Sequence, residues 1–126
     1  MNRAMRSELR AAIRTVTSSS EDTGMQDWTP RTDAPSGQSL EEVEAVLLDL
    51  RARLDKETNV LKGDVQRDAV VVLAARRQGY VIDLVIGRER APHSDEARFL
   101  SWIEHNGQVA LTTAPVRQLY AEVARW

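Results

Sequence analysis

Two apolar runs in the middle of the chain place the strongest constraint on its fold. Residues 69–73 read Ala-Val-Val-Val-Leu, residues 80–86 read Tyr-Val-Ile-Asp-Leu-Val-Ile, and residues 76–79 lie between them. Short runs rich in β-branched residues on either side of a glycine-containing turn are typical of paired strands. Apolar residues occupy both alternating positions of these runs, so both faces of the strands need a cover. We therefore expect a small α+β domain in which helices cover a β-hairpin or a three-stranded sheet.

The segment 40–57 has the pattern of a helix with one narrow apolar stripe. Ser39 stands before it and Glu42 follows three residues later, which is the spacing of a capping box at a helix N-terminus. The stripe has the three- and four-residue spacing of heptad a and d positions and consists of Leu40, Val43, Leu47, Leu50 and Leu54. Such a stripe packs either in the core of its own domain or on a partner. It is a candidate partner-binding surface, and we expect a homodimer that uses this helix or an edge strand.

Residues 1–16 form a separate basic amphipathic helix in this interpretation. One face is apolar, with Leu9, Ile13 and Val16, and the other carries Arg3, Arg6, Arg10 and Arg14. The arginine face suits an acidic partner or the chain's own acidic segment, nucleic-acid phosphates, or an anionic membrane surface. A solvated tail is the alternative. We predict that these arginines bind a protein partner.

Residues 17–38 are rich in Ser, Thr, Asp, Gly and Pro, and Met25 and Trp28 are their large apolar residues. A segment of this composition cannot build a core, so we expect an acidic flexible linker. The resulting organisation is a helix at 1–16, a linker at 17–38 and an α+β domain at 39–126. Because a solvated tryptophan leaves a large apolar surface in water, Trp28 is expected to bind either its own domain or a partner.

The C-terminal third has the pattern of two further helices. Ser94 is placed to cap a helix with Phe99, Trp102 and Ile103 on its buried side, which Asn106 and Gly107 would end. A short strand near 109–111 and a last helix with Pro115 in its first turn follow. That helix would carry Val116, Leu119, Tyr120 and Val123. Two helices joined in this way have the size of a helix-turn-helix, so Arg117, Gln118 and Arg125 are possible nucleic-acid contacts.

The sequence predicts no catalytic residue, metal ligand or cofactor. Asp83 and Glu89 on one strand suggest a metal-dependent nuclease, but they would lie about 20 Å apart at ~3.3 Å per residue. The structural alternative is that Asp83 pairs with Arg76 or Arg77. His93 and His105 are the only histidines and the chain has no cysteine, so no zinc pattern is present.

Composition and charge narrow the function classes. The 17 basic and 19 acidic side chains give a net charge of −2, which argues against a general polyanion binder. Residues 1–16 lack the apolar run of a signal peptide, and no stretch has the ~20 apolar residues of a membrane span. We therefore expect a cytoplasmic protein. We expect a small non-enzymatic protein-binding module: an adaptor, an immunity-type or anti-defence inhibitor, or an assembly accessory protein of bacterial or phage origin. The alternatives are a DNA-binding regulator that uses the C-terminal helix pair and the arginine-rich helix, and a nuclease-like enzyme.

Overall fold

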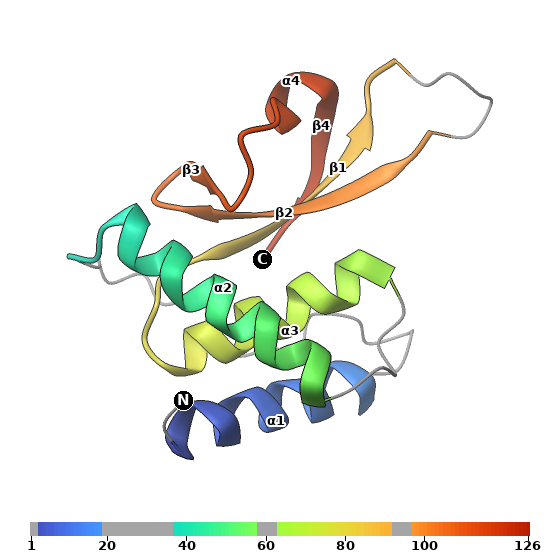
Figure 1. Cartoon of the computed structure of the whole chain (residues 1–126). Helices are drawn as coiled ribbons and strands as arrows, with labels where there is room; N and C mark the ends of the chain where they lie inside the picture. Colours follow the sequence, from blue (N-terminus) through green and yellow to red (C-terminus); the bar gives the residue numbers. More distant parts are fainter. Residues whose placement is uncertain (1–2, 19–36, 58–62, 92–96) are drawn as a thin grey trace.

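A computed structural model shows four helices and a four-stranded antiparallel sheet within the described residues, 3–18, 37–57, 63–91 and 97–126 (Figure 1). The helices are α1 (Arg3–Ser18), α2 (Leu40–Glu57), α3 (Gly63–Arg77) and α4 (Val116–Leu119). The strands are β1 (Asp83–Glu89), β2 (Phe99–His105), β3 (Gln108–Ala110) and β4 (Tyr120–Arg125). The expected α+β class is confirmed.

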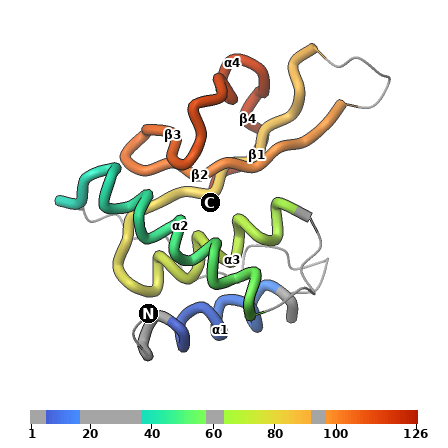
Figure 2. The backbone as a smooth tube through the Cα atoms, in the orientation of Figure 1, coloured from blue at the N-terminus to red at the C-terminus, as the bar shows by residue number. Residues whose placement is uncertain are grey.

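The elements form three layers. The strand order is β3-β2-β1-β4, so β3 and β4 are the two edges of the sheet. α2 and α3 lie against one face of the sheet, and α1 packs on the side of these helices that faces away from it (Figures 1 and 2). We call the sheet face turned away from the helices the outer face. The segment with α4 crosses this outer face and leads into β4.

α2 has the bounds and the cap that the sequence predicts. The backbone N–H of Glu42 donates to Ser39 Oγ at 3.2 Å, and Arg53 pairs with Asp49 at 3.2 Å one turn away. The Glu57 carboxylate at the end of α2 pairs with Arg10 of α1, whose Nε lies 3.2 Å away. The first of these contacts starts the helix, and the last joins it to α1.

The predicted strand at 69–73 is wrong, because this run belongs to α3. Residues 69–75 are all buried, since α3 packs between the sheet, α2 and α1. A helix that is covered on every side has no polar face, and its sequence therefore lacks the helical period. A short continuous apolar run fits either structure, and here the buried helix is the correct one.

The predicted helix after Ser94 is also wrong, since residues 99–105 form β2. Ser101 and Ile103 face the helices, whereas Trp102 and Glu104 face outward, which is the alternation of a strand. Asn106 and Gly107 form the tight turn to β3, with φ of 49° and 80°. Asn-Gly with positive φ at both positions is the preferred two-residue hairpin turn, so this dipeptide marked a hairpin rather than a helix end.

The predicted C-terminal helix is limited to α4, and residues 120–125 form β4. The C-terminal helix pair therefore does not exist, and the helix-turn-helix interpretation fails with it. β4 forms because its backbone groups pair with the free edge of β1. This long-range pairing leaves no periodic pattern in the local sequence.

α1 is packed rather than solvated. Leu9, Ala12 and Val16 are buried and belong to the same core cluster as α2 and α3. That residues 39–126 fold alone stays a prediction. Because α1 contributes to the core, these residues would have to fold without part of it. In the predicted linker 17–38, residues 17 and 18 belong to α1, while 19–36, including Trp28, lie outside the described residues.

Candidate functional site

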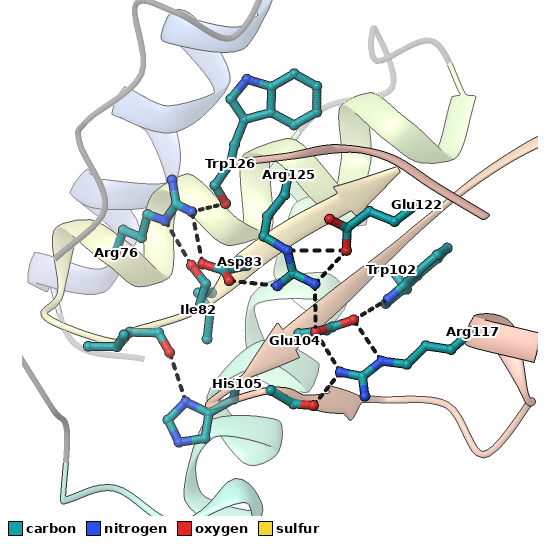
Figure 3. Close-up of polar contacts among 12 residues, drawn as sticks. Arg76, Ile82, Asp83, Trp102, Glu104, His105, Arg117, Glu122, Arg125 and Trp126 are labelled. Carbon is teal, nitrogen blue, oxygen red and sulfur yellow. Dashed lines mark hydrogen bonds and ion pairs between the residues drawn. The ribbon is translucent and has the colours of Figure 1, made fainter. Parts of the chain in front are cut away.

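Glu104 is the centre of a charged network on the outer face of the sheet (Figure 3). Its side chain is 1% exposed. The carboxylate accepts hydrogen bonds from Trp102 Nε1 at 2.7 Å, Arg117 Nη2 at 2.7 Å and Arg125 Nη2 at 3.0 Å. These donors lie on β2, α4 and β4, so one carboxylate joins the C-terminal segment to the middle of the sheet.

Arg125 extends the network to two further carboxylates. It donates to Asp83 Oδ2 at 2.8 Å and to Glu122 Oε1 at 2.6 Å. Arg76 of α3 reaches Asp83 at 3.9 Å and also donates to the carbonyl oxygens of Ile82 and Trp126. The predicted pair of Asp83 with Arg76 is present, but the closer partner, Arg125, was missed because its segment was interpreted as a helix.

The hydrogen bonds determine the protonation of this network. Burial by itself raises the pKa of Glu104, but the donors Arg117, Trp102 and Arg125 outweigh burial and lower this pKa below its usual value. The pKa of Arg117 is raised chiefly by its bond to Glu104, and that of Arg125 chiefly by its bond to Glu122. Glu104, Arg117 and Arg125 are therefore charged at neutral pH, and the Glu104 carboxylate lies against two guanidinium groups.

A small apolar cluster adjoins the network. Val85, Trp102 and Val116 are buried in it, and Tyr120 packs against them. Gly87 of β1 lies beneath the aromatic rings: a Cβ atom there would be 2.6 Å from the Trp102 ring and 2.8 Å from Tyr120 Cβ. Glycine at this position thus allows both Trp102 and β4 to approach β1 closely.

Three large apolar side chains of the sheet and of α4 are exposed. Phe99 is 60% exposed, Leu119 53% and Val123 54%, and we call these three residues the sheet-end surface. Phe99 pairs with Arg88 on one side of β1, and the Leu119 carbonyl accepts the Arg90 N–H at 2.9 Å on the other. Val123 is the unpaired residue of a bulge in β4, because Ile86 faces Ala124 and Gly87 faces Glu122.

A polar cavity of about 370 Å³ lies between α2, α3 and β2. Asp68 is buried in its wall and accepts bonds from Ser101 Oγ at 2.6 Å and Arg51 Nη2 at 3.0 Å. Burial raises the pKa of Asp68, and nearby Asp64 adds to this effect, while Ser101 and Arg51 oppose it. Sequence reasoning misses this site, because Asp68 and Ser101 lie on α3 and β2, where the sequence favours a strand and a helix.

The apolar stripe of α2 lies in the core. Val43, Leu47, Leu50 and Leu54 are fully buried within the chain, and Leu40 is partly buried. These side chains have no free surface for a partner, so the core alternative replaces the partner-binding one. The exposed large apolar residue of this helix is Leu48, next to Leu47, at 56%.

The other predicted contact residues are scattered over the molecule. Arg6, Arg10 and Arg14 line a groove on α1, where Arg6 and Arg10 both approach Glu57, and the Arg3 side chain lies outside the described part. Gln118 is exposed on α4, whereas Arg117 and Arg125 bind Glu104. The structure does not bring the arginines of α1 together with the predicted contact residues of the C-terminal segment.

Asp83 and Glu89 occupy opposite ends of β1 and share no site. His105 is buried, with Nδ1 2.8 Å from the Val81 carbonyl oxygen and Nε2 3.0 Å from that of Gln38, while His93 is outside the described residues. Within the described ranges, no group of three His, Asp or Glu side chains is placed to hold a metal ion.

Comparison of the chain with protein-family models, curated proteins and solved structures gave no match. None of the helices in the described part is long and apolar enough to cross a membrane.

Proposed function

We propose that the protein is a small non-enzymatic protein-binding module that uses the sheet-end surface. The observation that carries this proposal is the exposure of Phe99 and Val123 on the sheet and of Leu119 at the end of α4. Single exposed apolar side chains are ordinary, and Leu48 on α2 is one of them. Phe99 and Leu119 flank the same end of β1, and exposed apolar side chains gathered at one place are typical of an interaction surface.

The two sheet edges favour recognition through side chains over strand pairing. β3 has 3 residues, and β4 carries both a bulge and the charged residues Glu122 and Arg125. Short strands, bulges and charges all hinder the addition of a further strand at an edge. A partner is therefore expected to cover the exposed apolar groups instead of extending the sheet.

The sequence favours an adaptor, an immunity-type or anti-defence inhibitor, or an assembly accessory protein of bacterial or phage origin that is located in the cytoplasm, and we include these classes in the proposal. The arginine face of α1 is a second surface for an acidic partner. A DNA-binding function lacks the helix pair that it requires, and two of its three predicted contact residues, Arg117 and Arg125, bind Glu104.

Affinity capture with a matched pair of variants tests this proposal. The full-length chain and its variants Phe99→Ser/Leu119→Ser and Leu48→Ser are immobilised and exposed to lysate of the source cells, and the bound proteins are quantified. We expect one bound protein whose recovery is equal on wild type and on Leu48→Ser. Its recovery on the double variant should be at least about tenfold lower, which corresponds to a loss of about 1.4 kcal/mol in binding free energy. Equal recovery with all three chains, or no specific protein, would overturn the proposal.

A further inference from the structure

Leu111 joins β3 to the segment that crosses the outer face, and its backbone conformation is unusual. Its φ is +68°, a left-handed value that a bulky side chain rarely adopts. Asn106 also has a positive φ, of 49°, but asparagine tolerates this region and sits in a hairpin turn. Among the residues that the structure describes, Leu111 is thus a bulky residue held in a strained backbone conformation.

A carboxylate of α2 holds Leu111 in place. The Leu111 N–H donates to Glu44 Oε2 at 2.7 Å, and the Leu111 side chain packs against the main core. These contacts keep the backbone bent, so the chain returns across the sheet of its own subunit to β1. Without the bend, residues beyond 111 would continue away from the subunit.

The C-terminal segment is bound mainly by backbone pairing and charge. β4 pairs with β1, the Trp126 N–H donates to the Leu84 carbonyl at 2.9 Å, and Arg125 binds Asp83 and Glu104. Val116 is its one buried apolar side chain among the described residues 112–126. The groups that receive this segment lie outside it, on α3, β1, β2, the β2–β3 turn and Arg90, so a second copy of the chain offers the same set.

We propose that residues 112–126 exchange between two copies of this chain, with Leu111 as the hinge. In the exchanged dimer, β4 of each copy pairs with β1 of the other, and Arg125 binds the partner's Asp83 and the partner's Glu104. Leu111 becomes extended, which removes its left-handed conformation. Exchange of an identical element needs no new complementary surface, and only the hinge differs between the two forms.

A second copy fits this place better than an unrelated strand. Arg125 reaches Asp83 and Glu104 of the receiving sheet, and Glu122 of the same strand binds Arg125. Gly87 leaves room for Tyr120 beside Trp102. The bulge at Val123 sets the register of this pairing. A strand of another sequence would leave buried Glu104 with fewer donors.

Engineered cysteines test the exchange, because the chain contains none of its own. Arg88 and Ala121 face each other across β1 and β4. Full-length Arg88→Cys and Ala121→Cys chains are unfolded together, refolded at a series of concentrations and oxidised. Disulfide-linked species are then separated by mass. A mixture of Leu48→Cys with Ala121→Cys is the control, since these positions lie on α2 and β4.

Exchange places the new thiol of an Arg88→Cys chain beside the new thiol of an Ala121→Cys chain. We expect the mixed disulfide to exceed both like-with-like species by at least fivefold and to rise with concentration. The control pair should give the random proportion, in which the mixed species is half of the total. Random proportions for both mixtures, or no linked species at any concentration, would overturn the proposal.

Hinge variants separate exchange from a structural role of Leu111. Leu111→Asn tolerates the left-handed conformation and should lower the exchanged fraction severalfold, whereas Leu111→Val should raise it. Glu44→Ala removes the acceptor of the Leu111 N–H and should also raise it, whereas Glu44→Gln keeps an acceptor and should not. The same exchanged fraction in Leu111→Asn and Leu111→Val would contradict the hinge.

Discussion

The two faces of the sheet are held by different forces. Toward α2 and α3 the sheet meets the main core, where Leu84 and Ile103 are buried with the apolar residues of three helices. On the outer face the buried apolar residues in the described part are Val85, Trp102 and Val116, and beside them lies the network around Glu104. β2 serves both faces, because Ile103 and Glu104 are neighbours in the sequence and point to opposite sides.

This difference indicates how each half of the molecule responds to its conditions. Apolar burial contributes stability that changes little with pH or moderate salt. Ion pairs and charged hydrogen bonds depend on protonation and are weakened by salt where they are exposed. The helical layers should therefore stay folded under conditions that loosen β4 and α4.

The largest loss of stability is expected from substitutions of Leu47 in the core. Leu47→Asp places an unpaired charge among buried apolar groups and should unfold the chain, whereas Leu47→Ala should cost about 2–5 kcal/mol. Leu48→Asp, one residue away and exposed, should change stability by no more than about 0.5 kcal/mol. Circular dichroism with urea denaturation measures all three. A folded Leu47→Asp chain that has merely lost a dimer would show that the stripe is an interface after all.

Removal of residues 1–38 should cause the next largest loss of stability. The shortened chain uncovers the side of α3 that Leu9, Ala12 and Val16 bury. We expect residues 39–126 to fold, in line with the sequence prediction, but with a loss larger than the about 2–5 kcal/mol expected for Leu9→Ala. Thermal unfolding of the shortened chain and of full-length Leu9→Ala gives the comparison. An unchanged midpoint would mean that α1 adds nothing to the core.

Glu104→Gln tests the outer face. It removes the charge that Arg117 and Arg125 bind and should cost about 1–3 kcal/mol at pH 7. Because the folded-state pKa of Glu104 is lowered, its contribution is complete above the usual glutamate pKa and is lost as pH falls through the folded value. The difference between wild type and variant should therefore shrink in acid. Glu122→Gln, at the exposed rim of the network, is the control and should cost less than about 1 kcal/mol.

Asp68→Asn should have the smallest effect and the opposite pH dependence. Burial raises the folded-state pKa of Asp68, so the ionised form is disfavoured in the fold. Wild type should gain stability relative to the variant as pH falls through this raised pKa, until the unfolded chain is also protonated. At pH 7 we expect a change within about 1 kcal/mol, because loss of the Arg51 bond offsets removal of the buried charge. Urea denaturation from pH 7 to pH 3 measures it, and a growing advantage of the variant in acid would contradict the sign.

The sequence was sufficient where local rules decide the structure. The Ser39 cap and the spaced apolar residues of α2 predicted that helix within its observed bounds. It was insufficient where packing decides: α3 lost its helical period because it is covered on all sides, and β4 exists because β1 offers a free edge. Asn106 and Gly107 were a usable hairpin pattern that was interpreted as a helix end.

The same limit applies to the candidate site. The prediction of Arg117 and Arg125 as nucleic-acid contacts rests on an expected pair of C-terminal helices, whereas both bind Glu104 on a strand where the sequence favours a helix. The sheet-end surface depends on which side chains the fold leaves exposed, and the positions of Phe99, Leu119 and Val123 on the chain do not reveal this. Helix–strand assignment therefore limited the prediction of function more than any missing motif.

Amide hydrogen exchange, resolved by residue, tests most directly whether the two faces are held by different forces. Protection in β4, including the Trp126 N–H on Leu84, is compared with protection in α3 between pH 7 and pH 3 after correction for intrinsic rates. The account predicts that β4 loses protection as Glu104 becomes protonated, while α3 stays protected until the whole chain unfolds. Loss of protection in β4 and α3 together at every pH would show that one cooperative core holds both faces, and would contradict the account.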